Sequence, residues 1–279
     1  MQGTIFQILV LVTHGNMVLS SLPVASFYPE HEAFRFDEFV RFVDFERIGS
    51  TWNEHLFADN PNDWLTKLKN QRYSGLRVNR ISTDRKGLSD RMSVGFIGGG
   101  GRWLIEAVHP DGSDYWEAKW EVGDRGHFDR KIWRVTYMRI ARHQKSSPAQ
   151  TPTVDRLSTK MSRALQDAIA FSKRHQLDIF RAAFESGYST LKAESESELN
   201  RISLKGQLPR PASRLLAASQ AAWVFGGMGT WNDLCFDGDD QQQYEIISDN
   251  LFQLINLSII ATVNLSCPET KKPFWRFWQ

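Results

Sequence analysis

The chain has 279 residues, of which 41% are hydrophobic and 24% are charged. These are ordinary values for a globular protein, so they exclude disorder of the whole chain. The formal net charge of +2 is too small to indicate a nucleic-acid or membrane partner by itself.

The N-terminal segment is apolar from Ile5 to Val12, and no Lys or Arg precedes it. This run is short for the apolar core of a signal peptide and too short to span a membrane. A second methionine, Met17, opens a more ordinary run of residues. We therefore expect residues 1–16 to be an upstream extension or a loosely attached strand, with a cleaved signal peptide as the alternative.

Residues 17–145 have the pattern of an antiparallel β-rich region. Short runs bounded by Gly, Asp or Pro recur about every ten residues, which is typical of a β-meander. One helix is expected at residues 60–70, capped by Asn60 or Asn62 and with Pro61 in its first turn. The expected strands are 34–45, 75–82, 91–97, 102–109, 115–122 and 131–142.

Four consecutive glycines, Gly98 to Gly101, separate two of these strands. A hairpin turn with positive φ accounts for them. A phosphate-binding loop would need a helix to follow it, whereas residues 102–109 have the pattern of a strand. The pair Asp111–Gly112 predicts the next hairpin.

A linker at residues 146–153 precedes a helical region, residues 154–279. Apolar residues at helical spacing predict helices after Thr153, around Leu177 to Tyr188, from Pro211 to Gly226, and from about Gln243 to Leu265. The last helix is apolar but interrupted by polar residues, which indicates a buried helix of a soluble core. The tail KKPFWRFWQ is expected to dock on its own domain, with a partner or dimer mate as the alternative.

The fold class that follows is α+β, with an N-terminal, mainly antiparallel β-meander followed by a C-terminal helical half. The two halves can also form one integrated domain. Ten Trp and eighteen Phe indicate an aromatic core. Two cysteines, Cys235 and Cys267, are too few for a disulfide framework, so reduced thiols in a cytoplasmic protein are the simpler interpretation, although the two could pair.

Basic residues are concentrated between Lys67 and Arg91. A nucleic-acid site would need them on one face with exposed aromatic residues between them, and only Tyr73 is nearby. A solvated surface is the favoured interpretation, and nucleic-acid binding is the alternative. The residues considered for such binding are Lys67, Lys69, Arg72, Arg77 and Arg80.

Residues 102–134 contain many ionisable side chains threaded with tryptophans. In the expected strands, Trp103, Trp116 and Trp120 take one parity and charged residues take the other, which predicts an aromatic inner face and a salt-bridged outer face. Acid–base or metal chemistry is the alternative. Its candidate residues are Glu106, His109, Asp114 and His127.

No complete catalytic or ligand-binding motif supports that alternative. The chain has no HExxH, GxSxG or GxGxxG sequence, and the glycine of DGDD comes too early for an EF-hand. Acids beside Cys235 argue against a reactive thiolate. We expect no metal and no cofactor.

The most unusual stretch runs from Gly226 to Asp249. Three glycines precede Trp231, and six acids without any Lys or Arg lie between Trp231 and Asp249. Because no Lys or Arg occurs from Leu215 to Thr270, the counter-charge must come from the β-rich half or from another molecule. One interpretation is that Trp231 is a buried plug that fixes the loop. The residues considered for partner binding are Trp231, Asp233, Asp237, Asp239, Asp240 and Glu245.

A medium-sized α+β chain, rich in Trp, with an acidic segment and no catalytic signature resembles bacterial immunity and antitoxin proteins, which block basic nuclease toxins. The resemblance is one of overall character and covers no motif. It implies a non-enzymatic, cytoplasmic protein that binds a basic protein partner through carboxylates and aromatic anchors. A hydrolase or nuclease using the β-sheet carboxylates is the second hypothesis, and a nucleic-acid-binding module is the third.

Overall fold

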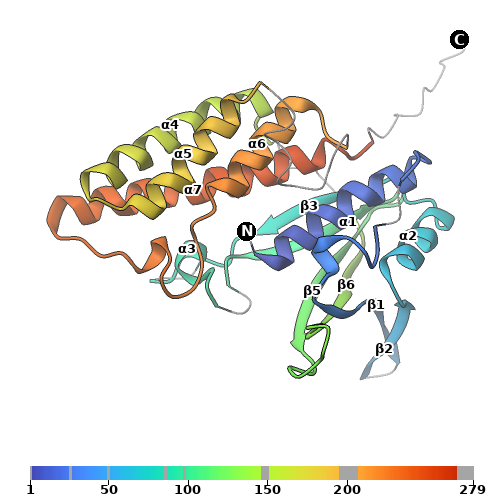
Figure 1. Cartoon of the computed structure of the whole chain (residues 1–279). Coiled ribbons are helices and arrows are strands. Elements are labelled where there is room, and N and C mark those ends of the chain that lie inside the picture. Colours follow the sequence, from blue (N-terminus) through green and yellow to red (C-terminus); the bar gives the residue numbers. More distant parts are fainter. Residues whose placement is uncertain are drawn as a thin grey trace, which may run out of the picture.

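The computed structural model describes residues 2–24, 27–48, 51–84, 87–96, 99–145, 151–194 and 207–268. It is an α+β fold, with a six-stranded sheet in the N-terminal half and a group of long helices in the C-terminal half. Figure 1 shows the helices lying beside the sheet, next to β3, while α1 crosses in front of the strands. Most of the predicted linker, and all of the aromatic tail, lie outside the described residues.

The sheet contains six strands in the order β2-β1-β6-β5-β4-β3. Four of the five neighbouring pairs are antiparallel, which confirms the prediction of a mainly antiparallel sheet. The pair β1 and β6 runs parallel, so the sheet is mixed. Val40 lies opposite Val135 and Phe42 opposite Tyr137, which places all four side chains in the core. The strands are β1 (Asp37–Ile48), β2 (Thr51–Ala58), β3 (Gly75–Ile81), β4 (Arg102–Val108), β5 (Ser113–Val122) and β6 (Trp133–Gln144).

The segment expected as a strand at residues 91–97 instead contains the short helix α3 (Asp90–Ser93). Ser89 caps this helix by accepting a hydrogen bond from the Met92 N–H at 3.3 Å. The glycines that follow therefore do not form a hairpin between two strands. Gly101 has positive φ, and a Cβ there would lie 2.9 Å from both Arg80 and Asp90, so it leaves room for their ion pair.

The N-terminal segment forms helix α1 (Gly3–Leu19), which is buried along most of its length. Leu9, Val10 and Leu11 are fully enclosed, and a Cβ at Gly15 would overlap Leu76 of β3. The expectation of a loosely attached strand is therefore wrong. The run is apolar on all sides because the sheet and the other helices surround it.

Helix α2 (Pro61–Asn70) begins as predicted, with the Asn60 side chain accepting a hydrogen bond from the Asp63 N–H at 2.9 Å. It places Trp64 against Phe42, with ring centroids 4.3 Å apart and nearly parallel planes. Stacked aromatic rings of this kind add packing energy beyond the area they bury. The Asn60 cap and Pro61 thus fix the start of α2, and this start determines where Trp64 enters the core.

The C-terminal helices are α4 (Val154–Arg174), α5 (Asp178–Lys192), α6 (Arg210–Ala221) and α7 (Gly238–Asn264). The Thr153 hydroxyl caps α4 by accepting a hydrogen bond from the Arg156 N–H at 3.3 Å. Helix α6 ends before Gly226, and α7 begins five residues earlier than Gln243. Among the described helices, α7 alone is long and apolar enough to span a membrane. The core helix of a soluble protein meets the same criteria. In α7, 67% of the apolar stretch is buried inside the protein.

Two asparagines join the helices to the free edge of β3. The Asn16 side chain, from α1, donates to Leu76 O at 2.9 Å and accepts from the Leu76 N–H at 2.6 Å. Asn264, the last residue of α7, makes the same pair of bonds with Val78, at 3.0 and 2.7 Å. The two side chains thus pair with edge positions that a seventh strand would otherwise occupy.

Candidate protein-binding surface

The acidic segment lies in the connection between α6 and α7 and in the first half of α7. Trp231 opens a 3-10 turn and is fully buried, with its indole Nε1 donating to Ser248 Oγ at 2.7 Å. The Tyr244 hydroxyl donates to the Trp231 carbonyl, and the rings of Phe180 and Phe184 pack edge-on against the indole. The plug interpretation is confirmed, and the proposed role of Trp231 as a partner-binding anchor is wrong because no part of it reaches the surface.

Asp233 stabilises the same loop. Its carboxylate accepts hydrogen bonds from the backbone N–H groups of Gly229 and Thr230, the second at 3.2 Å. Gly229 has positive φ, which a residue without a Cβ adopts at no steric cost. Asp233 therefore holds the shape of the loop that carries Met228.

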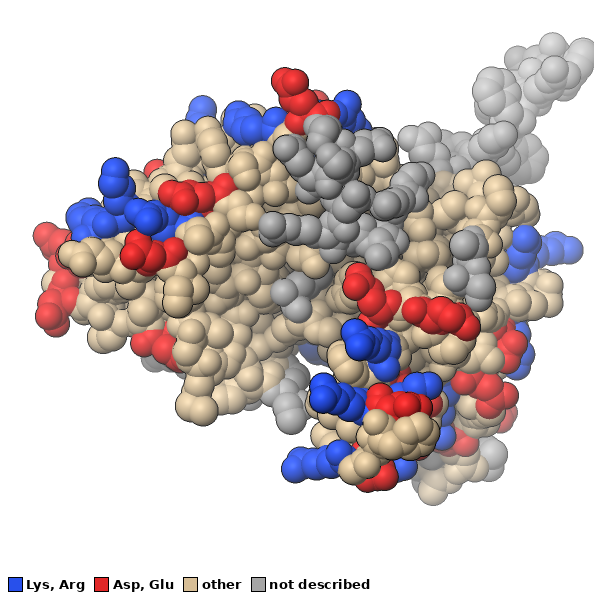
Figure 2. Space-filling model, in the orientation of Figure 1, with Lys and Arg blue, Asp and Glu red and all other residues tan. Residues whose placement is uncertain are grey.

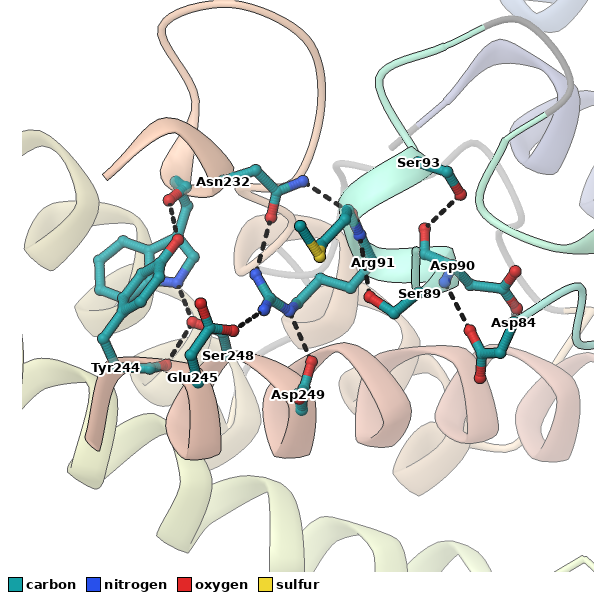
Figure 3. A network of polar contacts seen from close by, with 12 residues as sticks. Asp84, Ser89, Asp90, Arg91, Ser93, Asn232, Tyr244, Glu245, Ser248 and Asp249 are labelled. Carbon is teal, nitrogen blue, oxygen red and sulfur yellow. Dashed lines mark hydrogen bonds and ion pairs between the residues drawn. The ribbon is translucent and has the colours of Figure 1, made fainter. Parts of the chain in front are cut away.

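The β-rich half supplies a counter-charge to the acidic segment. Arg91 of α3 is 96% buried, and its guanidinium bonds to Asp249 Oδ1 at 2.6 Å and to Glu245 (Figure 3). Asn232 completes the contact by donating to the Arg91 carbonyl at 2.8 Å. Burial lowers the pKa of Arg91, but the hydrogen bond to Asp249 and the two carboxylate charges outweigh it, so the pKa lies above its ordinary value.

The other acids of the segment differ in their surroundings. Asp240 pairs with Arg174 of α4 at 2.7 Å and lies 3.6 Å from His175. Arg174 belongs to the helical half, so the expectation that the counter-charge must come from the β-rich half or from another molecule is wrong for Asp240. Asp237 and Asp239 are exposed, and no hydrogen bond or ion pair within the part of the chain that the structure describes involves their carboxylates. Glu245 and Asp249 remain about half exposed while they bind Arg91. The segment therefore keeps a negative surface despite its internal pairing.

Large apolar side chains are exposed around the Arg91 contact. Met228 is fully exposed and Phe96 is 70% exposed. The two segments that carry these side chains touch, because a Cβ at Gly95 would be only 2.4 Å from the Gly226 carbonyl oxygen. Ile246, also exposed, lies on the same face of α7 as Asp239, which is seven residues before it, and Asp249, which is three residues after it.

We call this region the junction surface, since it lies where α3, the α6–α7 loop and α7 meet. Sequence reasoning found its acids but missed its apolar residues. The only available signal was an apolar Met228 among glycines, outside any periodic helix. The junction surface consists of Leu88, Met92, Phe96, Met228, Asp239, Glu245, Ile246 and Asp249.

The candidate acid–base residues do not form one site. Glu106 lies opposite Tyr115 and Asp114 opposite Ala107, so the two carboxylates point to opposite faces of the sheet. Glu106 accepts from Asn79 at 2.7 Å and from Ser113 at 2.6 Å. Strand alternation therefore separates these two candidate carboxylates, so they do not form an acid–base pair.

Asp114 instead belongs to a buried ion cluster. Arg139 bonds to Asp114 at 2.9 Å and also to Asp44, and both acids are 1% exposed. The guanidinium lies over the neighbouring rings of Phe57 and Trp116, 4.9 and 5.2 Å from their centroids. Burial and nearby Arg142 lower the pKa of Arg139 to about 10.

Two histidines considered for catalysis lie apart. The His109 ring is 5.1 Å from that of Tyr73, whose hydroxyl donates to Asp114 at 2.5 Å. His127 lies in the β5–β6 loop, stacked on Phe128, and accepts from the Asp129 N–H. His109 and Asp114 thus both contact Tyr73, whereas His127 lies in a different part of the structure, the β5–β6 loop.

The expected segregation of the strands is confirmed in its main features. Trp103 and Trp116 are buried in the core, while Arg102 and Glu117 form an exposed ion pair on the other face. Trp120 is only half-buried and packs edge-on against Trp133. This arrangement accounts for most of the charged and aromatic residues between Arg102 and Arg134 without a catalytic role.

The basic residues from Lys67 to Arg91 are scattered. Lys67 donates to the Phe57 carbonyl at 2.6 Å, and Lys69 donates to the Val18 carbonyl at 3.1 Å. Arg77 lies 3.8 Å from Glu106, and the largely buried Arg80 bonds to Asp90 at 2.5 Å. Arg72 is exposed at the end of α2 with positive φ. On the face shown in Figure 2, basic side chains lie in separate groups beside acidic ones.

The described residues hold no group of three or more His, Cys, Asp or Glu side chains placed to bind a metal ion. Cys235 and Cys267 are free thiols, and burial raises the pKa of Cys267. The junction surface therefore stands out by its exposed apolar groups and its acids. No protein-family model, curated protein or solved structure matches the chain.

Proposed function

We propose that this chain is a non-enzymatic, cytoplasmic protein-binding module that uses the junction surface to bind a protein with a basic surface. The observation that carries the proposal is the exposure of large apolar side chains, Met228 and Phe96 above all, on segments held in place by Arg91. Exposed apolar groups bordered by polar residues are typical of protein-binding sites.

The surface is preorganised, which favours binding. The Trp231 plug, the Asp233 bonds and the Arg91 contact fix the two loops before any partner arrives. Rigid loops lose little conformational entropy on association, so more of the contact energy is retained as affinity.

The charge of the surface favours a basic partner. Glu245 and Asp249 remain about half exposed at the Arg91 contact, Asp239 is exposed on the same helix, and no Lys or Arg occurs from Leu215 to Thr270. Carboxylates at the rim of an interface speed the encounter with a positive partner and oppose a negative one. This is the property that an immunity or antitoxin-like protein needs against a basic nuclease.

The test begins with affinity capture from an extract of the source cells, with the wild-type chain and the Met228→Asp variant as baits. A protein enriched only by the wild type is then purified, and its binding is measured by calorimetry at several salt concentrations. We expect Met228→Asp to weaken binding by at least about tenfold, which is about 1.4 kcal/mol. We also expect Asp239→Asn to reduce the salt dependence of binding.

The matched control is Ile179→Asp, because Ile179 is equally apolar and 85% exposed but lies on α5. It should bind the partner as the wild type does. If the Met228→Asp variant binds the partner as tightly as the wild type, or if Ile179→Asp weakens binding as much as Met228→Asp does, the junction surface is not the binding site.

A further inference from the structure

We propose that the junction surface binds the segment Lys271–Trp278 of a second copy of this chain, so that the protein associates with itself. This inference rests on the proposed function, because it names the partner of the same surface. The segment lies outside the described residues, and only its sequence and its starting point enter the argument.

Charge complementarity is the first support. After Arg214, the only basic residues of the chain are Lys271, Lys272 and Arg276, all within this segment. The acids of the junction surface, by contrast, have one counter-charge among the described residues, the buried Arg91. A short basic segment can therefore pair with carboxylate oxygens that face solvent.

The apolar groups are also complementary. The segment also contains two pairs of aromatic residues on either side of Arg276, Phe274–Trp275 and Phe277–Trp278. Met92 and Met228, both exposed, offer flexible thioether side chains, which adapt to aromatic rings and make favourable sulfur–aromatic contacts. Trp and Phe are also the side chains most often found as anchors of an interface.

The length of the chain favours a second copy over the same copy. The chain leaves the structure at Pro268, and Cys267 next to it lies against Gly75, at the far end of α7 from Glu245. The helix spans about 29 Å between Glu245 and Asn264. Residues 268–278 span about 35 Å only when fully extended. To reach the junction surface of its own chain, the tail would have to be almost fully extended along α7. A tail from a second copy does not have to cross the length of α7.

Each copy carries one tail and one junction surface. Two copies that exchange tails make two equivalent contacts and form a closed dimer. The second contact is then intramolecular, so the exchange binds more tightly than a single tail would.

The test measures the mass of the full-length protein by light scattering over a range of concentrations. We expect the wild type to form a dimer at high concentration, and Ile179→Asp to do the same. Two full-length variants should remain monomeric: Met228→Asp, and a tail variant with Phe274, Trp275, Phe277 and Trp278 changed to Ala. A wild type that stays monomeric throughout would overturn the proposal.

A labelled synthetic peptide of residues 270–279 gives an independent measurement. It should bind the full-length tail variant, and binding should weaken at least about tenfold when Met228→Asp is added. Peptide binding without a dimer would mean that the tail docks on its own chain, which contradicts the second-copy proposal. If neither the peptide nor a dimer is observed but a purified cellular partner still depends on Met228, this inference fails and the proposed function stands.

Discussion

Two ionisable side chains packed around α1 respond to pH in opposite directions. Burial raises the pKa of Asp37 from 3.8 to about 7, although a hydrogen bond from Gln7 at 2.7 Å opposes the shift. Burial lowers the pKa of His14 from 6.5 to about 4. The fold therefore favours the neutral form of both groups.

The sign of each effect follows from proton binding. Folded Asp37 keeps its proton to about pH 7 and the unfolded chain only to about pH 4, so its contribution to stability falls as pH rises from 4 to 7. The unfolded chain protonates His14 below about pH 6.5 and the folded protein does not, so its contribution falls as pH drops from 6.5 to 4. In the wild type the two effects largely cancel.

We therefore expect two single variants to separate these effects. Asp37→Asn should give a free energy of unfolding that rises from pH 4 to 6.5, and His14→Gln should give one that falls from pH 4 to 7. Each change is on the order of 3–4 kcal/mol, since one pKa unit corresponds to about 1.4 kcal/mol. Urea denaturation at a series of pH values measures both, and equal slopes in the two variants would contradict the assignment.

The buried cluster around Arg139 gives a second prediction at the scale of single residues. Arg139→Met should reduce the free energy of unfolding by about 3–5 kcal/mol, because the buried Asp114 loses its arginine partner and Asp44 keeps only Arg142 of its two. The control Arg102→Met removes an exposed pair with Glu117 and should cost less than about 1 kcal/mol. Adding Asp44→Asn and Asp114→Asn to Arg139→Met should recover part of the loss; no recovery would show that packing, rather than charge, dominates.

At the scale of elements, the edge strand β3 depends on the two asparagines that bind it. Asn264→Ala removes both bonds to Val78, and the backbone groups left without a partner should cost about 2–3 kcal/mol. Hydrogen exchange at the Val78 amide should become faster while exchange in β5 stays slow. Asn250→Ala is the matched control, since Asn250 is exposed on the same helix and should leave both measurements unchanged.

The elements that could be predicted from the sequence are those specified by local signals. Asn60 and Pro61 mark the start of α2, and Thr153 marks the start of α4. Alternation around Trp103 and Trp116 specifies which side of the sheet each residue faces. Both signals act within a few residues, so no knowledge of the fold is needed.

The elements that could not be predicted depend on distant contacts. Strand β2 was missed because its outer residues are mostly polar and it pairs only with β1. Helix α3 is held by Arg91, whose partners Glu245 and Asp249 lie more than 150 residues away. The parallel pairing of β1 with β6 likewise joins residues about 95 positions apart, as in the bond from Arg41 to Thr136. In the candidate site, the plug formed by Trp231 could be predicted locally, whereas the exposure of Phe96 could not.

At the scale of the whole molecule, α1 is part of the core. A chain that begins at Met17 lacks Ile5, Ile8, Leu9, Leu11 and Val12, all buried. Each such side chain contributes about 1.5–3 kcal/mol, and a typical domain is stable by only about 5–15 kcal/mol. We expect the shortened chain to lack a cooperative thermal transition and a near-UV circular dichroism spectrum. A shortened chain with the wild-type spectrum and melting temperature would show that α1 is dispensable.

The asparagine contacts with β3 also set an order of events during synthesis. Asn16 and Leu76 leave the ribosome early, but Asn264 and Ser266, the latter bonded to Asn16, emerge only near the end. Until then the nascent β-sheet carries an open edge, which can pair with the same edge of a neighbouring chain on the same messenger. Completion of α7 thus closes the open edge of the sheet, at β3.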